Sequence, residues 1–98
     1  MSSFKIRFTP ESAKTIRKFH PDIKKLIRQA IDGLPHNPFK GDELQGELSG
    51  FRSLKPRRYR IIYKVDEENS WIEIYHVGHR RDIYENFRRF LTQISNKS

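Results

Sequence analysis

The sequence predicts an α+β fold in which helices pack on an antiparallel β-sheet. Apolar residues recur at every second position in several short segments, which is the period of a half-buried strand. In segments before and after the main group of strands they recur with helical spacing instead, which gathers them on one face of a helix. A chain of 98 residues has the length of one domain, so we expect residues 1–98 to form a single unit.

The first part of the chain is expected to form a strand and a helical hairpin. Residues 4–8 alternate between apolar and basic side chains, as in a strand with one face on a core. A Thr-Pro pair at residues 9–10 marks a helix start, because threonine is a good N-cap and proline fits the first helical turn. After a break at residues 20–22, a second helix carries its apolar residues on one face: Ile23, Leu26, Ile27, Ala30, Ile31 and Leu34.

The second half of the chain is expected to form three strands and a last helix. Residues 35–38 contain two prolines that end the second helix, and a glycine-containing loop follows. Strands are expected at residues 51–55, 58–65 and 71–77, joined into an antiparallel meander. Helical spacing returns at Ile83, Phe87, Phe90, Leu91 and Ile94. The expected order is β-α-α-β-β-β-α, with an N-terminal helical hairpin and a C-terminal helix.

Basic residues are concentrated on the long strand and on the segment that precedes it. Residues 52–64 contain no acid, and their cations are Arg52, Lys55, Arg57, Arg58, Arg60 and Lys64. Because side chains alternate along a strand, Arg58, Arg60 and Lys64 share one face. Arg60 lies within the strand, where an arginine is either paired with a buried acid or directed at a ligand such as phosphate.

A second group of candidate residues lies where the last strand meets the C-terminal helix. It comprises His79, Arg80 and Arg81, with Tyr84 shortly after them. Backbone N–H groups at a helix start favour anions, and a histidine can titrate near neutral pH. A tyrosine hydroxyl can donate or accept a hydrogen bond. From the residues alone, His79 is either an exposed junction residue or a functional one, and Tyr84 is either an aromatic at the core's edge or a functional one.

The composition favours an anionic partner and excludes several kinds of site. A net charge of +8 suits a polyanion, of which RNA and DNA are the commonest. The chain has no cysteine, which excludes disulfides and thiol catalysis, and its histidines lack metal-ligand spacing, so we expect no metal. We find no cofactor motif, signal peptide or membrane segment, and therefore expect a soluble cytoplasmic protein that uses no cofactor.

The order of elements, the run YRIIYKV at residues 59–65 and the run VGHRRDIY at residues 77–84 resemble the RelE/ParE superfamily of bacterial toxins. The resemblance covers nearly the whole chain. It implies a small three-layer fold with an antiparallel sheet, and an antitoxin partner that neutralises the toxin. In the RelE branch it implies metal-independent cleavage of mRNA in the ribosomal A site, where the substrate's own 2′-OH attacks the adjacent phosphate.

Matched residue by residue, the resemblance implies roles at the scissile phosphate. Arg60 and Arg80 would stabilise the charge that develops there, and Tyr84 would orient or activate the 2′-OH. The pattern leaves open whether Arg80 or Arg81 does this work. An arginine does not deprotonate in proteins, so the base is Tyr84, His79 or Lys55.

The strand before the long one departs from the family pattern. Arg52 matches a basic position of the RNA-cleaving members, but Leu54 stands where a second basic residue is expected, and Lys55 follows it. We take Lys55 as a further catalytic candidate. The other cations are expected to bind RNA: Arg52, Arg57, Arg58, Lys64 and Arg81.

Two other functions are compatible with the sequence. The ParE branch implies inhibition of DNA gyrase by a binding protein that is not an enzyme, and a non-toxic RNA-binding module would keep the basic surface without cutting RNA. The leading hypothesis is a ribosome-dependent endoribonuclease, because Arg80 and Tyr84 are both present. In each toxin reading, the charge of the chain should attract an acidic, partly disordered antitoxin segment.

Overall fold

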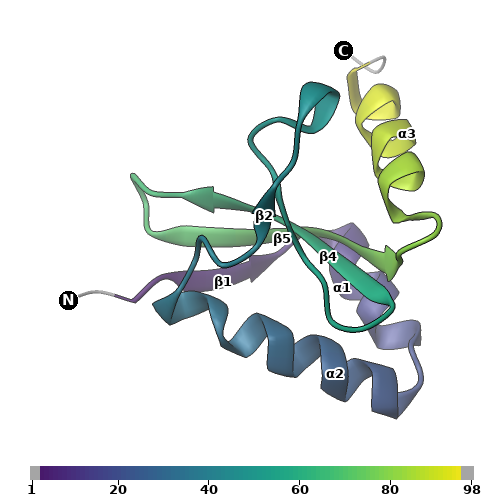
Figure 1. Cartoon of the computed structure of the whole chain (residues 1–98), viewed down its shortest axis with the longest axis horizontal. Coiled ribbons are helices and arrows are strands. Elements are labelled where there is room, and N and C mark those ends of the chain that lie inside the picture. The colour runs from purple at the N-terminus through teal and green to yellow at the C-terminus, as the bar shows by residue number, and fades with distance from the viewer. Residues whose placement is uncertain (1–2, 96–98) are drawn as a thin grey trace.

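The computed structural model describes residues 3–95, which form an α+β fold with a five-stranded sheet and three α-helices (Figure 1). The strands are β1 (Lys5–Phe8), β2 (Asp42–Glu43), β3 (Arg52–Leu54), β4 (Tyr59–Asp66) and β5 (Trp71–His79). The helices are α1 (Pro10–Lys18), α2 (Pro21–Asp32) and α3 (Ile83–Ser95), with short 3₁₀ turns at Leu34–His36 and Gly46–Leu48. The expected fold class, helical hairpin, meander and C-terminal helix are confirmed.

The sheet differs from the expected one at its two edges. Its strand order is β1-β5-β4-β3-β2, and the pairs from β2 to β5 are antiparallel as expected. β1 instead runs parallel to β5, because the helical hairpin carries the chain away before the meander brings β5 to its side. β2 lies in a segment that the sequence predicts as a loop, because a strand of two residues has no detectable period.

Side-chain caps fix where α1 and α2 begin. The Thr9 hydroxyl accepts a hydrogen bond from the backbone N–H of Ser12, and Pro10 occupies the first turn of α1. His20 caps α2 in the same way, since its Nδ1 accepts from the backbone N–H of Asp22. The break between the helices is therefore as short as the sequence predicts.

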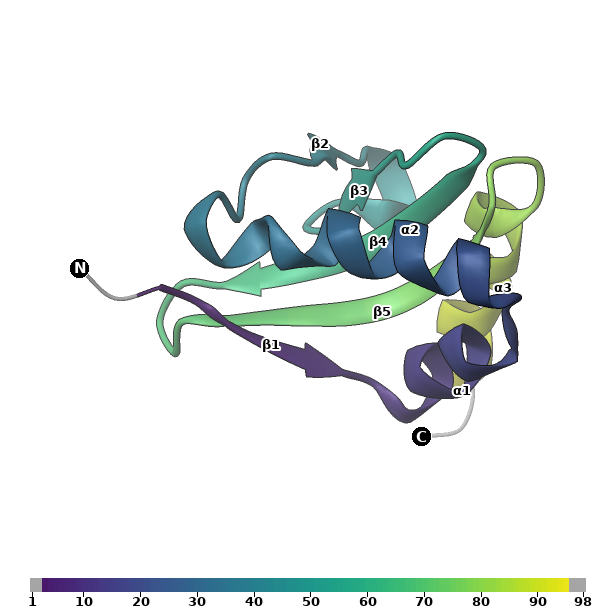
Figure 2. The same ribbon diagram turned by 90° about the horizontal axis from the view of Figure 1, so that it is seen from below.

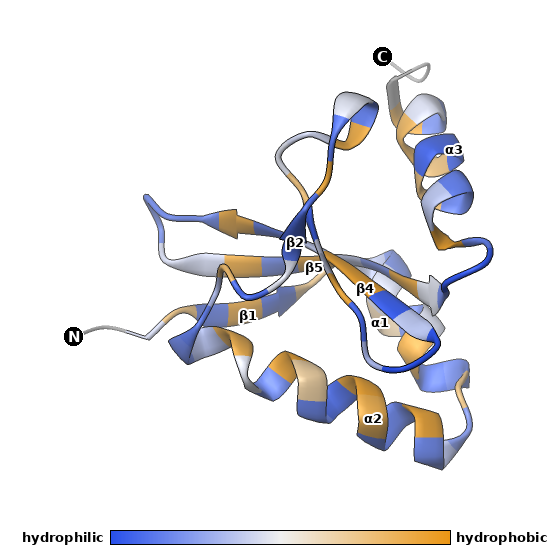
Figure 3. Cartoon of the chain, viewed as in Figure 1, coloured by the Kyte–Doolittle hydropathy of each residue, from blue (hydrophilic) through white to orange (hydrophobic). Residues whose placement is uncertain are grey.

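The two faces of the sheet carry separate apolar cores. On one face α1 and α2 cover buried side chains of β4 and β5, and Figure 2 shows α2 crossing in front of the sheet. On the other face the β2–β3 segment and α3 cover the sheet, and the buried residues there are Leu48, Ile62, Ile83 and Phe87. We call this second side the α3 face. Figure 3 shows that the β3–β4 loop and the β5–α3 turn, which lie at one end of the sheet, are both hydrophilic.

β5 contains a bulge that changes which side chains face α3. Tyr75 is an extra residue in the pairing with β4, because Ile74 and His76 have adjacent partners there. Tyr75 and His76 therefore both lie on the α3 face, where each ring contacts Phe87. Beyond the bulge the alternation is shifted by one position, so Val77 packs in the core under the helical hairpin.

A buried tyrosine holds the segment that leads into β2. The Tyr63 hydroxyl donates to the carbonyl oxygen of Pro38 at 2.7 Å and accepts from the N–H of Gly41 at 2.9 Å. A Cβ at Gly41 would lie 2.8 Å from the Tyr63 ring, so this close approach requires glycine. Arg52 adds a hydrogen bond of 2.7 Å to the Gly41 carbonyl oxygen. These contacts fix the position of Asp42, the first residue of β2.

Candidate functional site

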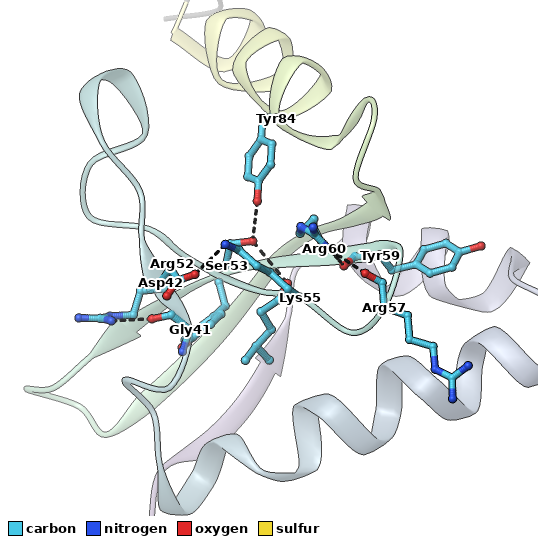
Figure 4. A network of polar contacts seen from close by, with 11 residues as sticks. Gly41, Asp42, Arg52, Ser53, Lys55, Arg57, Tyr59, Arg60 and Tyr84 are labelled. Atoms are coloured by element: carbon cyan, nitrogen blue, oxygen red, sulfur yellow. Dashed lines mark hydrogen bonds and ion pairs between the residues drawn. The ribbon is translucent and has the colours of Figure 1, made fainter.

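Polar side chains from β3, β4 and α3 meet on the α3 face, at the end of the sheet where β4 begins and β5 ends (Figure 4). Arg60 lies two residues before the buried Ile62, so strand alternation directs both side chains to this face. The partner of Arg60 on β5 is Gly78, where a Cβ would lie 3.0 Å from Ile83. Glycine at this position lets the start of α3 pack against the sheet, and Figure 4 shows Tyr84 directed from α3 at the same region.

The guanidinium of Arg60 is anchored through one nitrogen. Its Nη1 donates to the carbonyl oxygens of Tyr59 at 2.7 Å and Arg57 at 3.1 Å. Within residues 3–95, Nε and Nη2 have no hydrogen-bond partner, and no carboxylate forms an ion pair with Arg60. The planar edge formed by Nε and Nη2 can therefore bind two oxygens of a phosphate.

Two further arginines occupy opposed backbone positions at this end of the sheet. The backbone N–H of Arg80 donates to the carbonyl oxygen of Arg58 at 2.8 Å, which continues the β4–β5 pairing by one residue beyond Tyr59 and His79. Both residues are exposed in the turns next to β4 and β5, and alternation continued by one residue beyond the strand ends places them on the side of Arg60. Like charges at opposed positions of a sheet destabilise it. In the described part of the chain no acid pairs with either arginine, so this cluster suits an external anion.

A tyrosine hydroxyl is held above the sheet next to these cations. Tyr84 lies in the first turn of α3, and its hydroxyl is 3.0 Å from the hydroxyl of Ser53 on β3. Ser53 is buried and stands opposite Ile62 in the pairing of β3 with β4. Figure 4 shows the Tyr84 ring directed from the helix at Ser53, with Arg60 beside it.

Lys55 reaches the same face from the end of β3. Its ammonium lies 2.7 Å from Asp42 Oδ2, and Asp42 stands opposite Ser53 in the pairing of β2 with β3. The hydrogen bond from Lys55 and its positive charge lower the pKa of the Asp42 carboxyl. Because both groups are exposed, a substrate phosphate can compete with Asp42 for the ammonium.

The other candidate residues lie away from this cluster. His79 is paired with Tyr59, and the two rings make an edge contact with centroids 5.7 Å apart on the side of the helical hairpin. Figure 4 shows Arg57 extending away from the site toward α2. Lys64 lies over the Phe51 ring, with its Nζ 5.6 Å from the ring centroid. Arg81 is exposed in the turn before α3.

The side chains that face Tyr84 from β3 and the residue after it are Ser53 and Lys55, whereas the sequence suggests Arg52 and Leu54, each one residue earlier. Arg52 is paired with Tyr63, whose ring belongs to the core under the helical hairpin, and Leu54 is buried in that core. Ser53 and Lys55 therefore take the two positions on the α3 face. Ser53 and Lys55 are polar residues two positions apart, which is the spacing of side chains on one face of a strand. A strand of only three residues, however, does not reveal which of its two faces is buried.

Comparison with known proteins identifies the group to which this chain is related. A sequence model of the family described as the ParE toxin of type II toxin–antitoxin system, parDE, matches residues 6–84. The chain belongs to the RelE/ParE family of toxins. It is 32% identical to Toxin RelG of Mycobacterium tuberculosis over 83 residues, which covers 83% of this chain and 95% of that protein. Toxin RelE of the same organism is 25% identical over 83 residues, covering 83% of this chain and 86% of its own length.

Solved structures of related toxins have the same fold. The toxin–antitoxin complex RelBE2 from Mycobacterium tuberculosis contains a chain that matches this toxin with a TM-score of 0.74 and 30% identity, covering 80% of this chain and 99% of that one. The intact RelBE toxin–antitoxin complex of E. coli contains a chain that matches with a TM-score of 0.70 and 18% identity, covering 79% and 96%. The resemblance of the sequence to this family is therefore confirmed.

The described part of the toxin contains no cluster of three or more His, Cys, Asp or Glu side chains that could hold a metal ion. None of its helices within residues 3–95 has both the length and the hydrophobicity needed to cross a membrane. The groups that converge on the α3 face are therefore guanidinium, ammonium and hydroxyl groups. Such groups can bind an anion, stabilise negative charge and exchange protons.

One half-buried histidine of the toxin is not indicated by the sequence pattern. His76 follows the bulge, and its ring lies 5.5 Å from Phe87 and 5.6 Å from Phe90 of α3. Its Nδ1 is buried and has no hydrogen-bond partner in the part of the chain that the structure describes. Burial therefore lowers the pKa of His76 below its usual 6.5, and protonation of the ring opposes the packing of α3 on the sheet.

The toxin is expected to lose stability in mild acid because of His76. A histidine whose folded pKa is depressed contributes stability that is complete above pH 6.5 and is lost as the pH falls through the folded pKa. We expect the urea midpoint to fall between pH 7.5 and pH 5.5, and to fall less in a His76→Gln variant that cannot become protonated. Equal pH dependence in the two proteins would show that His76 does not titrate on unfolding.

Proposed function

We propose that the protein is a ribosome-dependent mRNA endoribonuclease that inhibits translation. The observation that carries the proposal is the unoccupied Nε–Nη2 edge of Arg60, which shares the α3 face with the Tyr84 hydroxyl and the Lys55 ammonium. A phosphate bound at Arg60 would have a cation on one side and a hydroxyl near the adjacent ribose. This combination fits a reaction in which RNA supplies its own nucleophile.

In the proposed reaction the 2′-oxygen of the substrate forms a bond to the adjacent phosphorus, and the bond from phosphorus to the 5′-oxygen breaks. A hydrogen bond with the Tyr84 hydroxyl orients the 2′-OH before attack, and as the new bond forms the 2′-OH proton passes to a water molecule. The leaving 5′-oxygen takes a proton from the Lys55 ammonium, which water then reprotonates. The products are a 2′,3′-cyclic phosphate and a 5′-hydroxyl. Arg60 and Arg80 stabilise the extra negative charge on the phosphoryl oxygens, for which preorganised cations typically contribute several kcal/mol.

Dependence on the ribosome follows from the weakness of the base. His79 contacts Tyr59 on the other side of the sheet, so its imidazole does not join the proposed site. Water and a phenol are poor bases, and such a site works well only when the 2′-OH is held in line with the leaving oxygen. A ribosome that binds and positions mRNA in its A site can supply this alignment.

The decisive experiment adds the purified protein to a cell-free translation reaction and maps mRNA 5′ ends by primer extension, with and without ribosomes. New cuts that require ribosomes support the proposal. Cuts in naked RNA would indicate a free ribonuclease with the same chemistry. Undamaged mRNA with normal translation would contradict the proposal.

Replacing Arg80 is expected to reduce cleavage far more than replacing Arg81. Both residues are exposed in the turn after β5, but only the backbone N–H of Arg80 continues the pairing with β4, through Arg58, that places it next to Arg60. We expect cleavage by Arg80→Ala to fall by about 100-fold or more, as for loss of one charge-stabilising donor. Arg81→Ala removes the same charge and should change cleavage by less than about tenfold. Equal losses in the two variants, measured by primer extension, would assign both arginines to general RNA binding.

The match to the ParE family model favours a second candidate function, inhibition of DNA gyrase without nuclease chemistry. A gyrase inhibitor would bind its target through a surface and would not require the Arg60 edge or the Tyr84 hydroxyl. Loss of gyrase supercoiling in the presence of the protein, with mRNA left intact, would support this function over the nuclease.

We also propose that a cognate antitoxin binds and neutralises this protein. The net charge of +8 favours an acidic partner, and the two related structures described above are toxin–antitoxin complexes. An apolar groove of about 250 Å³ lies between β1, α1 and α2, and Lys24 and Arg28 are among the residues that line it. An acidic amphipathic segment would suit this groove. If the product of the neighbouring gene did not bind the purified protein, the proposal would fail.

A further inference from the structure

Ser53 is a buried polar residue of β3 whose hydroxyl is directed at the proposed site. Its side chain is 1% exposed, and it stands opposite Ile62 under the apolar core of the α3 face. Buried hydroxyl groups are nearly always hydrogen-bonded, because an unpaired one is costly. The two neighbours of Ser53 Oγ are the Tyr84 hydroxyl at 3.0 Å and the Leu54 carbonyl oxygen at 3.4 Å.

The contact with Tyr84 is the stronger of these two. Hydrogen bonds between hydroxyl groups typically span about 2.5–3.0 Å, so the 3.4 Å contact with Leu54 is weak. Either hydroxyl can donate in the 3.0 Å contact between Ser53 and Tyr84. Figure 4 shows that this contact joins β3 to α3 beside Arg60.

We propose that Ser53 is a positioning residue that fixes the place of the Tyr84 ring and of its hydroxyl group at the proposed site. This inference rests on the proposed nuclease function. A Tyr84 hydroxyl held by Ser53 can form a hydrogen bond with the substrate 2′-OH in a fixed place. Without Ser53 the Tyr84 hydroxyl would lose this anchor. Ser53 touches neither substrate nor phosphate, and acts only through Tyr84.

The first test follows the Tyr84 ring in the free protein and requires no activity. Aromatic ¹³C relaxation of tyrosine-labelled protein is compared between the wild type and Ser53→Ala. We expect the Tyr84 ring to become more mobile in the variant, while the Tyr63 ring, held by Pro38 and Gly41, keeps its order. An unchanged Tyr84 ring would overturn the proposal that Ser53 holds it.

The second test is a double-mutant cycle on single-turnover mRNA cleavage. Loss of one hydrogen bond corresponds to about a tenfold change, so Ser53→Ala should slow cleavage by about tenfold. Binding to ribosomes, measured by co-sedimentation, should stay unchanged. In a Tyr84→Phe background the same substitution should have no further effect. A tenfold loss that persists without the Tyr84 hydroxyl, or no loss in either background, would overturn the role of Ser53.

The two tests separate failure of this inference from failure of the proposed function. If the wild type does not cleave mRNA, the nuclease function is contradicted, and with it the catalytic role of Ser53. The relaxation experiment still decides whether Ser53 holds Tyr84. If the wild type cleaves mRNA and the cycle is additive, the nuclease function stands and the role of Ser53 is rejected.

Discussion

Replacing Arg60 with alanine is expected to reduce ribosome-dependent mRNA cleavage by about 100-fold or more while the fold is retained. The guanidinium is held by two backbone carbonyl oxygens and presents an unoccupied planar edge, so it is preorganised for a phosphate. Its side chain forms no ion pair in the described part of the chain that the substitution would break. The expected loss is therefore catalytic and not structural.

The measurement is primer extension on mRNA in translating extracts, with two further variants. Arg60→Lys keeps the charge but not the planar edge, and should recover only a small part of the activity. Arg17→Ala removes one positive charge from the exposed side of α1, and should leave cleavage nearly unchanged. Wild-type cleavage by a folded Arg60→Ala protein would contradict the proposed site.

Replacing Phe87 with alanine is expected to lower the free energy of unfolding by about 3–5 kcal/mol. Phe87 is 0% exposed and joins α3 to both the sheet and the β2–β3 segment. Its ring centroid lies 4.9 Å from that of Phe51 and 5.5 Å from that of His76. The substitution leaves a cavity under the helix that carries Tyr84, so cleavage should weaken as well.

Urea denaturation followed by circular dichroism measures this effect. Ile94→Ala serves as the control, because Ile94 lies on the same helix but is 52% exposed, and we expect a loss of less than about 1 kcal/mol. Similar losses in the two variants would mean that α3 is not anchored through Phe87.

Much of the fold could be predicted from the sequence, because its main elements have strong periods. The apolar face of α2 spans three turns, and β4 alternates apart from Ile62, which is apolar on the face that also carries Arg60. Arg60 could be chosen because it lies within a strand without an acid nearby in the sequence. The parallel pairing of β1 could not be predicted, because the alternation of a short strand does not reveal whether its partner runs parallel or antiparallel to it.

The faces of two strands were harder to predict. Simple alternation along β5 would direct Arg80 to the same side as Ile72 and Ile74, away from Arg60. The bulge at Tyr75 shifts the alternation and brings Arg80 to the α3 face. A bulge depends on the pairing of both strands, so one strand's sequence does not reveal it. The same reasoning applies to Ser53, whose burial depends on α3 and not on its neighbours in β3.

The opposed arginines at the end of β4 and β5 link the stability of this protein to its function. Arg58 and Arg80 carry like charges at opposed backbone positions, and we expect an anion bound between them to relieve their mutual repulsion. Any such ligand, whether RNA or an acidic protein segment, must therefore raise the free energy of unfolding as it binds. A variant in which one arginine becomes glutamate would gain stability without a ligand and lose the affinity that the repulsion supports. Maximal stability of the free chain and maximal affinity for a polyanion are thus opposing demands on the same two positions.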